Sequence, residues 1–258
     1  MTLTDSFKQY PVEDLDSIET GLLALKKEVY PLEWARLMNI KGILLSSLKR
    51  NIEAADIFNE ALPYADDILK CKIMLNNAKN DFYAERTDSA LELIGKVFDL
   101  AKTLKGNMTN FFLAHSHFLR GQIYYQTKRD KAAAVSEFKM AEFYFEGIAD
   151  LLDVGLSCME IARVHIKNKY LRPVWNYLKK SEDCLRKFGL QENLGVMVCR
   201  AVALFHSARE EEAQALLKEI YKLYDEFGQG HYMISQILDI YLDIHTRTQK
   251  YISTHGLT

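Results

Sequence analysis

The chain has 258 residues, of which 48% are hydrophobic and 26% are charged, a composition typical of a globular protein and not of a disordered or fibrous one. Its 33 basic and 35 acidic residues give a net charge of −2, which provides no long-range attraction to nucleic acid or to anionic lipid. No apolar run approaches the roughly 20 residues that span a bilayer. The first ten residues, MTLTDSFKQY, are not expected to hold a secretory signal. Four scattered cysteines without CxxC pairing predict a reduced, cytoplasmic setting.

In chain order, a solitary helix is expected first, over about Val12 to Val29. Apolar residues then recur in steps of three and four, as in Leu37, Ile40 and Leu44, which is the period of a helix. No segment alternates with the two-residue period of a strand. The predicted fold class is therefore all-α.

A short polar turn followed by a small residue recurs along the chain and predicts helical hairpins. Their second helices should start near Ile52, Ser89, Lys131, Pro173 and Glu210, and a last helix is expected over about His231 to Thr248. The small residues of the second helices are Ala54, Ala90, Ala133, Val174 and Ala213. Twelve residues before each lies another small residue, and these form the series Gly42, Ala78, Gly121, Ala162 and Ala201.

Both series advance by 36, 43, 41 and 39 residues, so they describe five repeats in register. Two antiparallel helices cross closely only where each contributes a small side chain, which explains why a small pair recurs once per hairpin. Polar residues in the turns, Asn51, Asp88 and Asp130, are predicted to cap the second helices by accepting hydrogen bonds from their first N–H groups.

This pattern resembles the tetratricopeptide repeat (TPR) family. The first repeat carries the small and apolar residues of the family signature at Gly42, Leu45, Ala54, Phe58 and Ala61. The third carries Gly121, Tyr124, Phe138 and Ala141, the last two displaced by one residue. The resemblance implies a right-handed α-solenoid of about five TPR-like hairpins forming one domain over 1–258. Its parts are an N-terminal capping helix (1–31), the hairpins (32–228) and a terminal helix (229–258).

Enzyme signatures are missing from the sequence, which contains no GxxxxGK[ST], GxGxxG, GxSxG or HExxH motif. His115 and His117 are the only close histidine pair, and residues two apart on a helix point in nearly opposite directions, so they cannot share a metal ion. We therefore expect neither catalysis nor a metal or other cofactor.

A solenoid of hairpins has a concave groove lined by the first helix of each repeat, and such grooves bind extended peptides. The resemblance implies that carboxamides grip the peptide backbone and that cations pair with a carboxylate. The predicted ligand-binding residues are Asn39, Asn76, Lys79, His115, Gln122, Tyr125, Arg163 and Lys167. The competing interpretation is a solvated polar inner face that holds no ligand.

The sequence thus favours a non-enzymatic scaffold for a peptide or protein segment that carries a carboxylate, with no role for nucleic acid or membrane. The alternative is an N-terminal sensory domain of a larger bacterial signalling protein, because the long repeats are similar to the sensory halves of peptide-pheromone receptors and some diguanylate cyclases. The consecutive rings of Phe143, Tyr144 and Phe145 cannot all face inward on one helix, so at least one is exposed and a homodimer contact there stays open.

Overall fold

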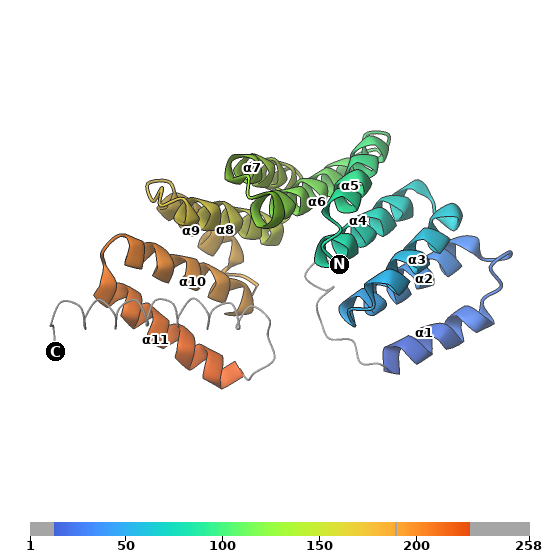
Figure 1. Ribbon diagram of the computed structural model, residues 1–258, viewed down its shortest axis with the longest axis horizontal. Helices are drawn as coiled ribbons and strands as arrows, with labels where there is room; N and C mark the ends of the chain where they lie inside the picture. Colours follow the sequence, from blue (N-terminus) through green and yellow to red (C-terminus); the bar gives the residue numbers. More distant parts are fainter. Residues whose placement is uncertain (1–12, 189, 228–258) are drawn as a thin grey trace. The chain divides into compact units, whose positions relative to one another are not determined.

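A computed structural model describes residues 13–188 and 190–227 as a series of helices joined by short turns (Figure 1). These residues contain no strand, which confirms the all-α prediction. The predicted helix at 231–248 lies outside the described residues. The helices are α1 (Glu13–Ala24), α2 (Pro31–Ser47), α3 (Asn51–Ala61), α4 (Asp67–Tyr83), α5 (Thr87–Ala101), α6 (Asn107–Ile123), α7 (Lys131–Gly147), α8 (Leu151–Lys167), α9 (Val174–Leu185), α10 (Leu190–His206) and α11 (Glu210–Phe227).

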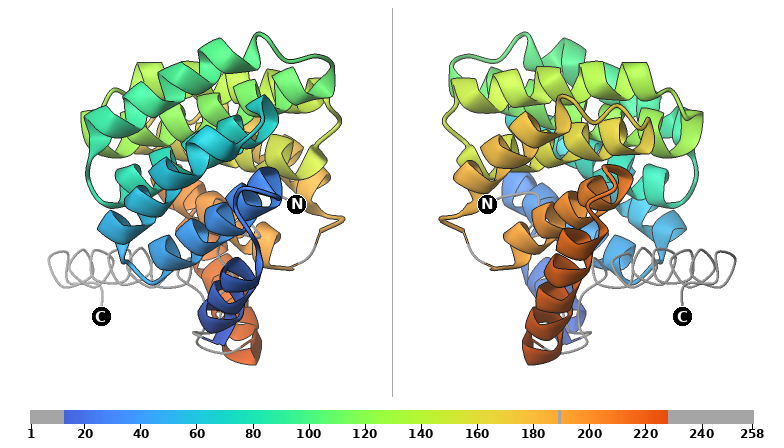
Figure 2. Two further views of the ribbon diagram at one scale, coloured as in Figure 1. Left: turned by 90° about the vertical axis from the view of Figure 1, so that its right-hand side faces the viewer. Right: turned by 90° about the vertical axis from the view of Figure 1, so that its left-hand side faces the viewer.

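Contacts divide the chain into two compact units, Met1–Ala149 and Asp150–Thr258. Unit 1 contains α1 and the hairpins α2/α3, α4/α5 and α6/α7, and unit 2 contains the hairpins α8/α9 and α10/α11. Within each unit, successive helices run antiparallel as side-by-side pairs (Figure 2). The first helix of each pair is called the A helix below and the second the B helix.

Each A helix ends in a turn built on one left-handed residue. Lys49, Glu85, Arg129, Lys169 and Ala208 all have positive φ, and none of them is glycine. In the first hairpin the N–H of Arg50 bonds the carbonyl of Leu45 and the N–H of Lys49 bonds that of Ser46, which satisfies the exposed carbonyls at the helix end. Because this turn recurs, the register between the A and B helices recurs with it.

The third hairpin carries one extra residue in this turn. A π-helical turn, η3 (Tyr124–Lys128), follows α6, and the N–H of Asp130 bonds the carbonyl of Tyr124, six residues back where the other turns span five. The small residue at the register position of Ala54 in this hairpin is therefore Ala134, which is fully buried, and the prediction of Ala133 was wrong by one residue. The displaced Phe138 and Ala141 in the sequence reflect this insertion.

The small residue of each A helix faces one large side chain of its B helix, and their sizes vary together. A Cβ on Gly42 would lie 2.5 Å from the Phe58 ring, and a Cβ on Gly121 would lie 2.8 Å from the Phe138 ring. Where the A helix has alanine, the same B-helix position holds a smaller residue. The register pairs Ala78 with Ile94, Ala162 with Leu178 and Ala201 with Leu217, all of them buried.

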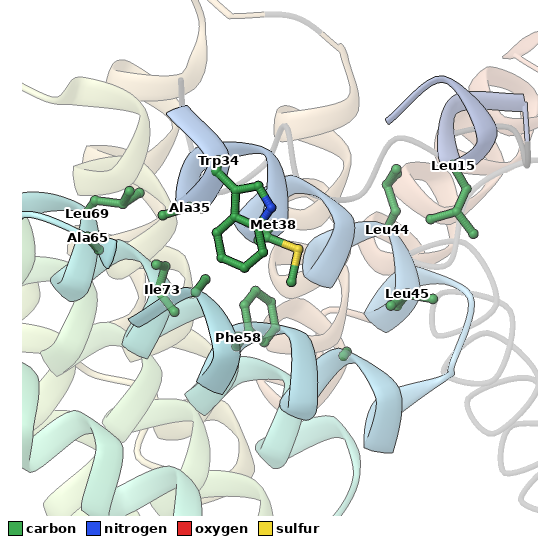
Figure 3. Close-up of a cluster of buried hydrophobic side chains, with 12 residues drawn as sticks. Leu15, Trp34, Ala35, Met38, Leu44, Leu45, Phe58, Ala65, Leu69 and Ile73 are labelled. Carbon is green, nitrogen blue, oxygen red and sulfur yellow. The ribbon is translucent and has the colours of Figure 1, made fainter. Parts of the chain in front are cut away.

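Helix α1 packs on the first hairpin through the hydrophobic cluster shown in Figure 3, in which Leu15 of α1 lies beside Leu44 and the Trp34 ring lies beside Met38. Lys41 of α2 also binds Glu19 of α1 at 2.8 Å. The helix ends at Ala24, five residues earlier than predicted, because the chain turns before Pro31 starts α2.

Helix caps differ in part from the prediction. Asp130 caps α7 as expected, since its side chain accepts a bond from the N–H of Ala133 at 2.9 Å. Asn51 and Asp88 lie inside the first turns of α3 and α5, so their assignment as caps was wrong. The unpredicted caps are Asp66 on α4 and Asp150 on α8.

Three of the four cysteines are buried, and the aromatic run of α7 divides between the core and the surface. All four cysteines are reduced, and burial raises the pKa of the Cys71 thiol to about 12, so it behaves as a small hydrophobe. In the aromatic run, Phe145 is fully buried, Tyr144 is half-buried and Phe143 is 64% exposed, which confirms that one ring faces outward.

Candidate functional site

One face of the first two A helices of unit 1 carries two of the predicted ligand-binding residues, Asn76 and Lys79. Positions six and two before the small residue, and one and five after it, lie on the same side of a helix. On α2 and α4 these positions are exposed or half-buried. We call them the A-helix face of unit 1, and they are Arg36, Ile40, Ile43, Ser47, Lys72, Asn76, Lys79 and Tyr83.

The two predicted asparagines of this region meet directly. The Asn76 side-chain amide on α4 donates a hydrogen bond to the Asn39 carbonyl oxygen on α2 at 3.0 Å. Asn39 is buried, whereas Asn76 is half-buried. The pair therefore joins neighbouring A helices, and Asn76 is the member that reaches the surface.

Cations gather on the A-helix face without an acid among its eight positions. Arg36 and Lys72 occupy equivalent positions on α2 and α4, and both are exposed. Lys79 lies two turns along α4 from Lys72 and is half-buried. Among the described residues, neither Arg36 nor Lys72 forms an ion pair, so their charges are available to a ligand.

His115 belongs to the packing of the third hairpin. Its ring is 2% exposed and lies 4.3 Å from the Phe111 ring and 4.9 Å from the Phe145 ring. Burial, with a smaller contribution from the positive charge of Lys79, lowers the pKa of His115 to about 3. The imidazole is therefore neutral at physiological pH, and it neither carries charge nor faces solvent.

Gln122 and Tyr125 are half-buried and lie near the end of the third A helix. Gln122 is on α6, and Tyr125 is in the η3 turn that contains the inserted residue. Gln122 occupies the same register position as Lys79 and Arg163, one residue past the small residue. Asn39 and Asn76 occupy two other register positions, so the three carboxamides do not form a single row.

In unit 2 the predicted cation Arg163 is bound to an acid of its own helix. Its guanidinium lies 2.6 Å from the carboxylate of Glu160, whose side chain is only 7% exposed. Burial raises the pKa of Glu160 despite the nearby Arg163 charge, and burial raises the pKa of the adjacent Cys199 thiol to about 12. Lys167 is exposed in the last turn of α8.

Sequence reasoning missed three features of these faces. Ile68 and Tyr83 are 38% and 48% exposed on α4, and extending the helical period by one turn in each direction would have found them. The Glu160–Arg163 pair has the i, i+3 spacing that joins side chains on a helix, so the sequence did contain its signal.

Unit 2 also contains an open hollow of about 440 Å³, lined by residues of α9, α10 and α11 that include Trp175, Arg200 and Glu219. Its charges are largely matched, because Arg209 binds Glu212 at 2.6 Å and Arg200 binds Glu182 at 2.5 Å. In the described part of the chain no group of three or more His, Cys, Asp or Glu residues is placed to hold a metal ion. No described helix has the length and apolar character needed to cross a membrane.

The fold and these faces define a protein built from repeated helical hairpins. No protein-family model matches the sequence, and no curated protein matches it either. Solved structures do match its fold, and they identify the hairpins as the TPR type.

The TPR-like repeats of a kinesin light chain-like protein from Podospora anserina superpose with a TM-score of 0.57 at 16% identity, covering 76% of this chain and 97% of that one. A point variant of those repeats gives the same TM-score at 15% identity, with coverage of 72% and 92%. The apo form of RapI superposes with a TM-score of 0.67 at 11% identity, covering 94% of this chain and 68% of RapI. The chain therefore has a TPR-like fold of helical hairpins.

Proposed function

We propose that this chain is a non-enzymatic scaffold that binds an extended peptide or protein segment on the A-helix face of unit 1. The observation that carries the proposal is the charge of that face: Arg36, Lys72 and Lys79 lie among its eight positions and no acid does. On a chain with a net charge of −2, this local excess of cations is not a by-product of a basic composition.

The chemistry of the face suits a peptide that carries carboxylates and apolar side chains. Lysine and arginine form charge-assisted hydrogen bonds with carboxylates. Ile40 and Tyr83 are 42% and 48% exposed and offer apolar surface next to the cations. The half-buried Asn76 amide can serve a peptide backbone, since a carboxamide has both donors and an acceptor.

A sensory domain of a larger signalling protein is the second candidate. It would use the same face for its ligand and pass the bound state to another domain. The fold likeness to RapI over 94% of this chain supports this candidate. The RapI structure is an apo form, which means the ligand-free state, so a similar fold belongs to a protein that takes a ligand. Both candidates predict a peptide ligand for unit 1.

The test is a selection of 12-residue peptides from a random display library on the full chain. The selected peptides should be rich in Asp or Glu. Lys72→Ala should weaken them by roughly ten- to a hundred-fold, the loss expected for one charge-assisted hydrogen bond. Because Lys72 is exposed, the thermal melt of this variant should match that of the parent.

Lys139→Ala is the matched control, since Lys139 is an exposed lysine on the B helix α7. Peptides that bind both variants as well as the parent would contradict the proposal. Arg163→Ala is a poor test, because it would leave the buried Glu160 carboxylate without its cation and destabilise unit 2.

A further inference from the structure

An ammonium group is held between two aromatic rings and a carboxylate at the start of the first hairpin. The Nζ atom of Lys27 lies 4.2 Å from the centre of the Trp34 ring and 4.3 Å from that of the Tyr64 ring. The carboxylate of Glu60 lies 3.5 Å from the same atom. We call Trp34, Tyr64 and Glu60 the ammonium notch.

One wall of the notch, Trp34, belongs to the packed first hairpin, whereas Tyr64 lies in the short helical turn Leu62–Tyr64 that follows α3 and is 37% exposed. Trp34 is only 7% exposed and belongs to the hydrophobic cluster of Met38 and Phe58 (Figure 3). The Trp34 and Tyr64 rings also contact each other edge to face, with centroids 5.2 Å apart. Core packing therefore holds the Trp34 ring, and the ring contact places Tyr64 against it, without help from Lys27.

The ammonium group itself comes from a different kind of segment. Lys27 lies in the turn between α1 and α2, outside both helices, and its side chain is 29% exposed. A cation–π contact at an exposed site is individually weak, so leaving the notch requires only a rearrangement of a surface turn. The walls are fixed and their occupant is replaceable.

We propose that the ammonium notch is a binding site for a primary ammonium group, filled here by the chain's own Lys27 and available to the ammonium group of a ligand when Lys27 leaves. The site uses none of the residues of the A-helix face and is independent of the function proposed above. The chemistry is shared by a lysine side chain of a partner protein and by a free alkylamine.

Hydrogen bonding selects a primary ammonium over a quaternary one. Desolvation alone would lower the pKa of Lys27. The hydrogen bonds to Tyr64 and Glu60, together with the electrostatic attraction to these two groups, raise the pKa above the ordinary lysine value. A quaternary ammonium keeps the attraction to the rings but has no N–H to donate to Tyr64 or Glu60.

Lys27 competes with any ligand at the high effective concentration of a group on the same chain. A tethered competitor on a short linker acts at roughly millimolar concentration or above. An external ammonium binds only those molecules in which the notch is empty, so with Lys27 filling it about nine-tenths of the time or more, its removal should strengthen binding by at least about tenfold.

The experiment uses the full chain with Trp175→Phe, which leaves Trp34 as the single tryptophan of the two in the sequence. Trp34 fluorescence is titrated with butylammonium chloride at constant ionic strength, with and without Lys27→Ala. The Lys27→Ala protein should show a saturable change with an apparent affinity at least about tenfold tighter than the protein that retains Lys27. If the Lys27→Ala protein does not fold, the same titration is carried out with Lys27→Gln.

Two further arms identify the chemistry and the source of the ligand. Glu60→Gln in the Lys27→Ala background should weaken butylammonium several-fold and tetramethylammonium less, because the quaternary cation loses only the attraction to the Glu60 charge and no hydrogen bond. A capped Gly-Lys-Gly peptide that binds more tightly than butylammonium assigns the notch to a protein lysine, and equal affinity assigns it to a free amine.

No saturable response with either Lys27 variant would overturn the proposal. So would a response that survives Tyr64→Leu, or one equal in proteins with and without Lys27. A circular dichroism melt of each variant shows that the fold is intact before the titration is read.

Discussion

At the scale of single residues, the close crossing of the helices in each hairpin depends on a pair of side chains. Gly42 and Gly121 each lie against a phenylalanine ring that leaves no room for a Cβ atom. Gly95, in the middle of α5, is the opposite case, since a Cβ there would meet nothing within 4 Å. The chain therefore offers glycines of both kinds in similar helices.

Gly42→Ala should destabilise the protein, because its new Cβ would lie 2.5 Å from the Phe58 ring. Overpacking of this kind typically costs about 1–3 kcal/mol. Gly95→Ala, as control, should stabilise the protein by about 0.5–1 kcal/mol through the better helix propensity of alanine. Urea denaturation measures both free energies of unfolding.

A second substitution tests whether the size of the partner ring is the cause. The double variant Gly42→Ala/Phe58→Leu recreates the pairing that Ala162 and Leu178 make in unit 2. It should lose less stability than the two single variants together, with a coupling free energy of about 0.5–3 kcal/mol. Additive losses would show that the crossing is not limited by this pair.

Glu137 of α7 is the centre of a polar contact in the third hairpin. Its carboxylate lies 2.7 Å from Nδ1 of His117 and 2.8 Å from Nε of Arg120, both on α6. Burial alone would raise the pKa of Glu137, but the hydrogen bonds and charges of these two partners lower it below its ordinary value.

Because the folded pKa of Glu137 is lower than the unfolded one, its ion pairs stabilise the protein at pH values above the unfolded pKa. That contribution is lost as the pH falls from about 4.3, the unperturbed value for glutamate, through the lower folded value. Glu137→Gln should therefore lower the melting temperature at pH 7 and lower it less at pH 3. Glu92→Gln, which breaks an exposed pair with Lys96, should change little at either pH. Equal destabilisation by Glu137→Gln at both pH values would contradict this account.

At this scale, the sequence predicts the residues that recur in every repeat, and it does not predict side-chain contacts that occur in only one place. Gly42 and Gly121 stand out because small residues recur at the same register. The Asn39–Asn76 bond joins residues of different repeats at different register positions. His115 looked like a groove residue because a helical period indicates which side it faces, but the period does not reveal the Phe111 and Phe145 rings that cover it.

At the scale of elements, the third hairpin differs from the others by the one residue inserted in η3. The left-handed residue follows the small residue by eight positions there (Gly121 to Arg129) and by seven in the first hairpin (Gly42 to Lys49). From the left-handed residue onward, the spacing to the B helix is the same. The insertion is therefore confined to the end of the A helix.

Deletion of Gln126 should convert this hairpin to the shorter turn and leave the fold intact. The register from Gly121 to its B-helix partner would then match that of the first hairpin, so α7 would keep its buried face. Circular dichroism should show unchanged helicity and a cooperative urea transition.

Deletion of Ala84 from the second turn is the matched control, because that turn has no extra residue. It would rotate α5 by about 100° relative to α4 and expose Ala90 and Ile94. A loss of stability as large for the Gln126 deletion as for the Ala84 deletion would show that the π turn is required by the packing.

Predictions of the elements succeeded where a pattern repeats. The starts of α3, α5, α7, α9 and α11 were predicted within two residues, because each follows the same polar turn. Helix α1 was predicted to extend to Val29 but ends at Ala24, and no repeat marks that end. In the sequence, the insertion in η3 shows only as the one-residue displacement of Phe138 and Ala141. That displacement does not tell whether the extra residue lies at the end of the A helix or at the start of the B helix.

At the scale of the whole molecule, the contacts of the chain fall into two units with unequal numbers of hairpins. Unit 1 contains three described hairpins and α1, whereas unit 2 contains two. Arrays of this kind need about three repeats to bury enough apolar surface for independent stability. The two units should therefore differ in their ability to fold alone.

The fragment 1–149 is expected to fold by itself and to unfold cooperatively in urea. The fragment 150–258 should be markedly less stable, with a lower urea midpoint. Circular dichroism of both fragments, beside the full chain, provides the comparison. A fragment 1–149 without a cooperative transition would show that unit 1 needs the rest of the chain.

The matched pairs of small and large residues also bear on how such an array can be rebuilt. Averaging the repeats into one consensus sequence would place an alanine opposite a phenylalanine at this register position, a combination that none of the five described hairpins contains. Breakpoints for recombination therefore belong between hairpins and not in the turn within a hairpin. A gene duplication that copies whole hairpins keeps both members of each pair, and the same rule tells a protein engineer which blocks can be exchanged.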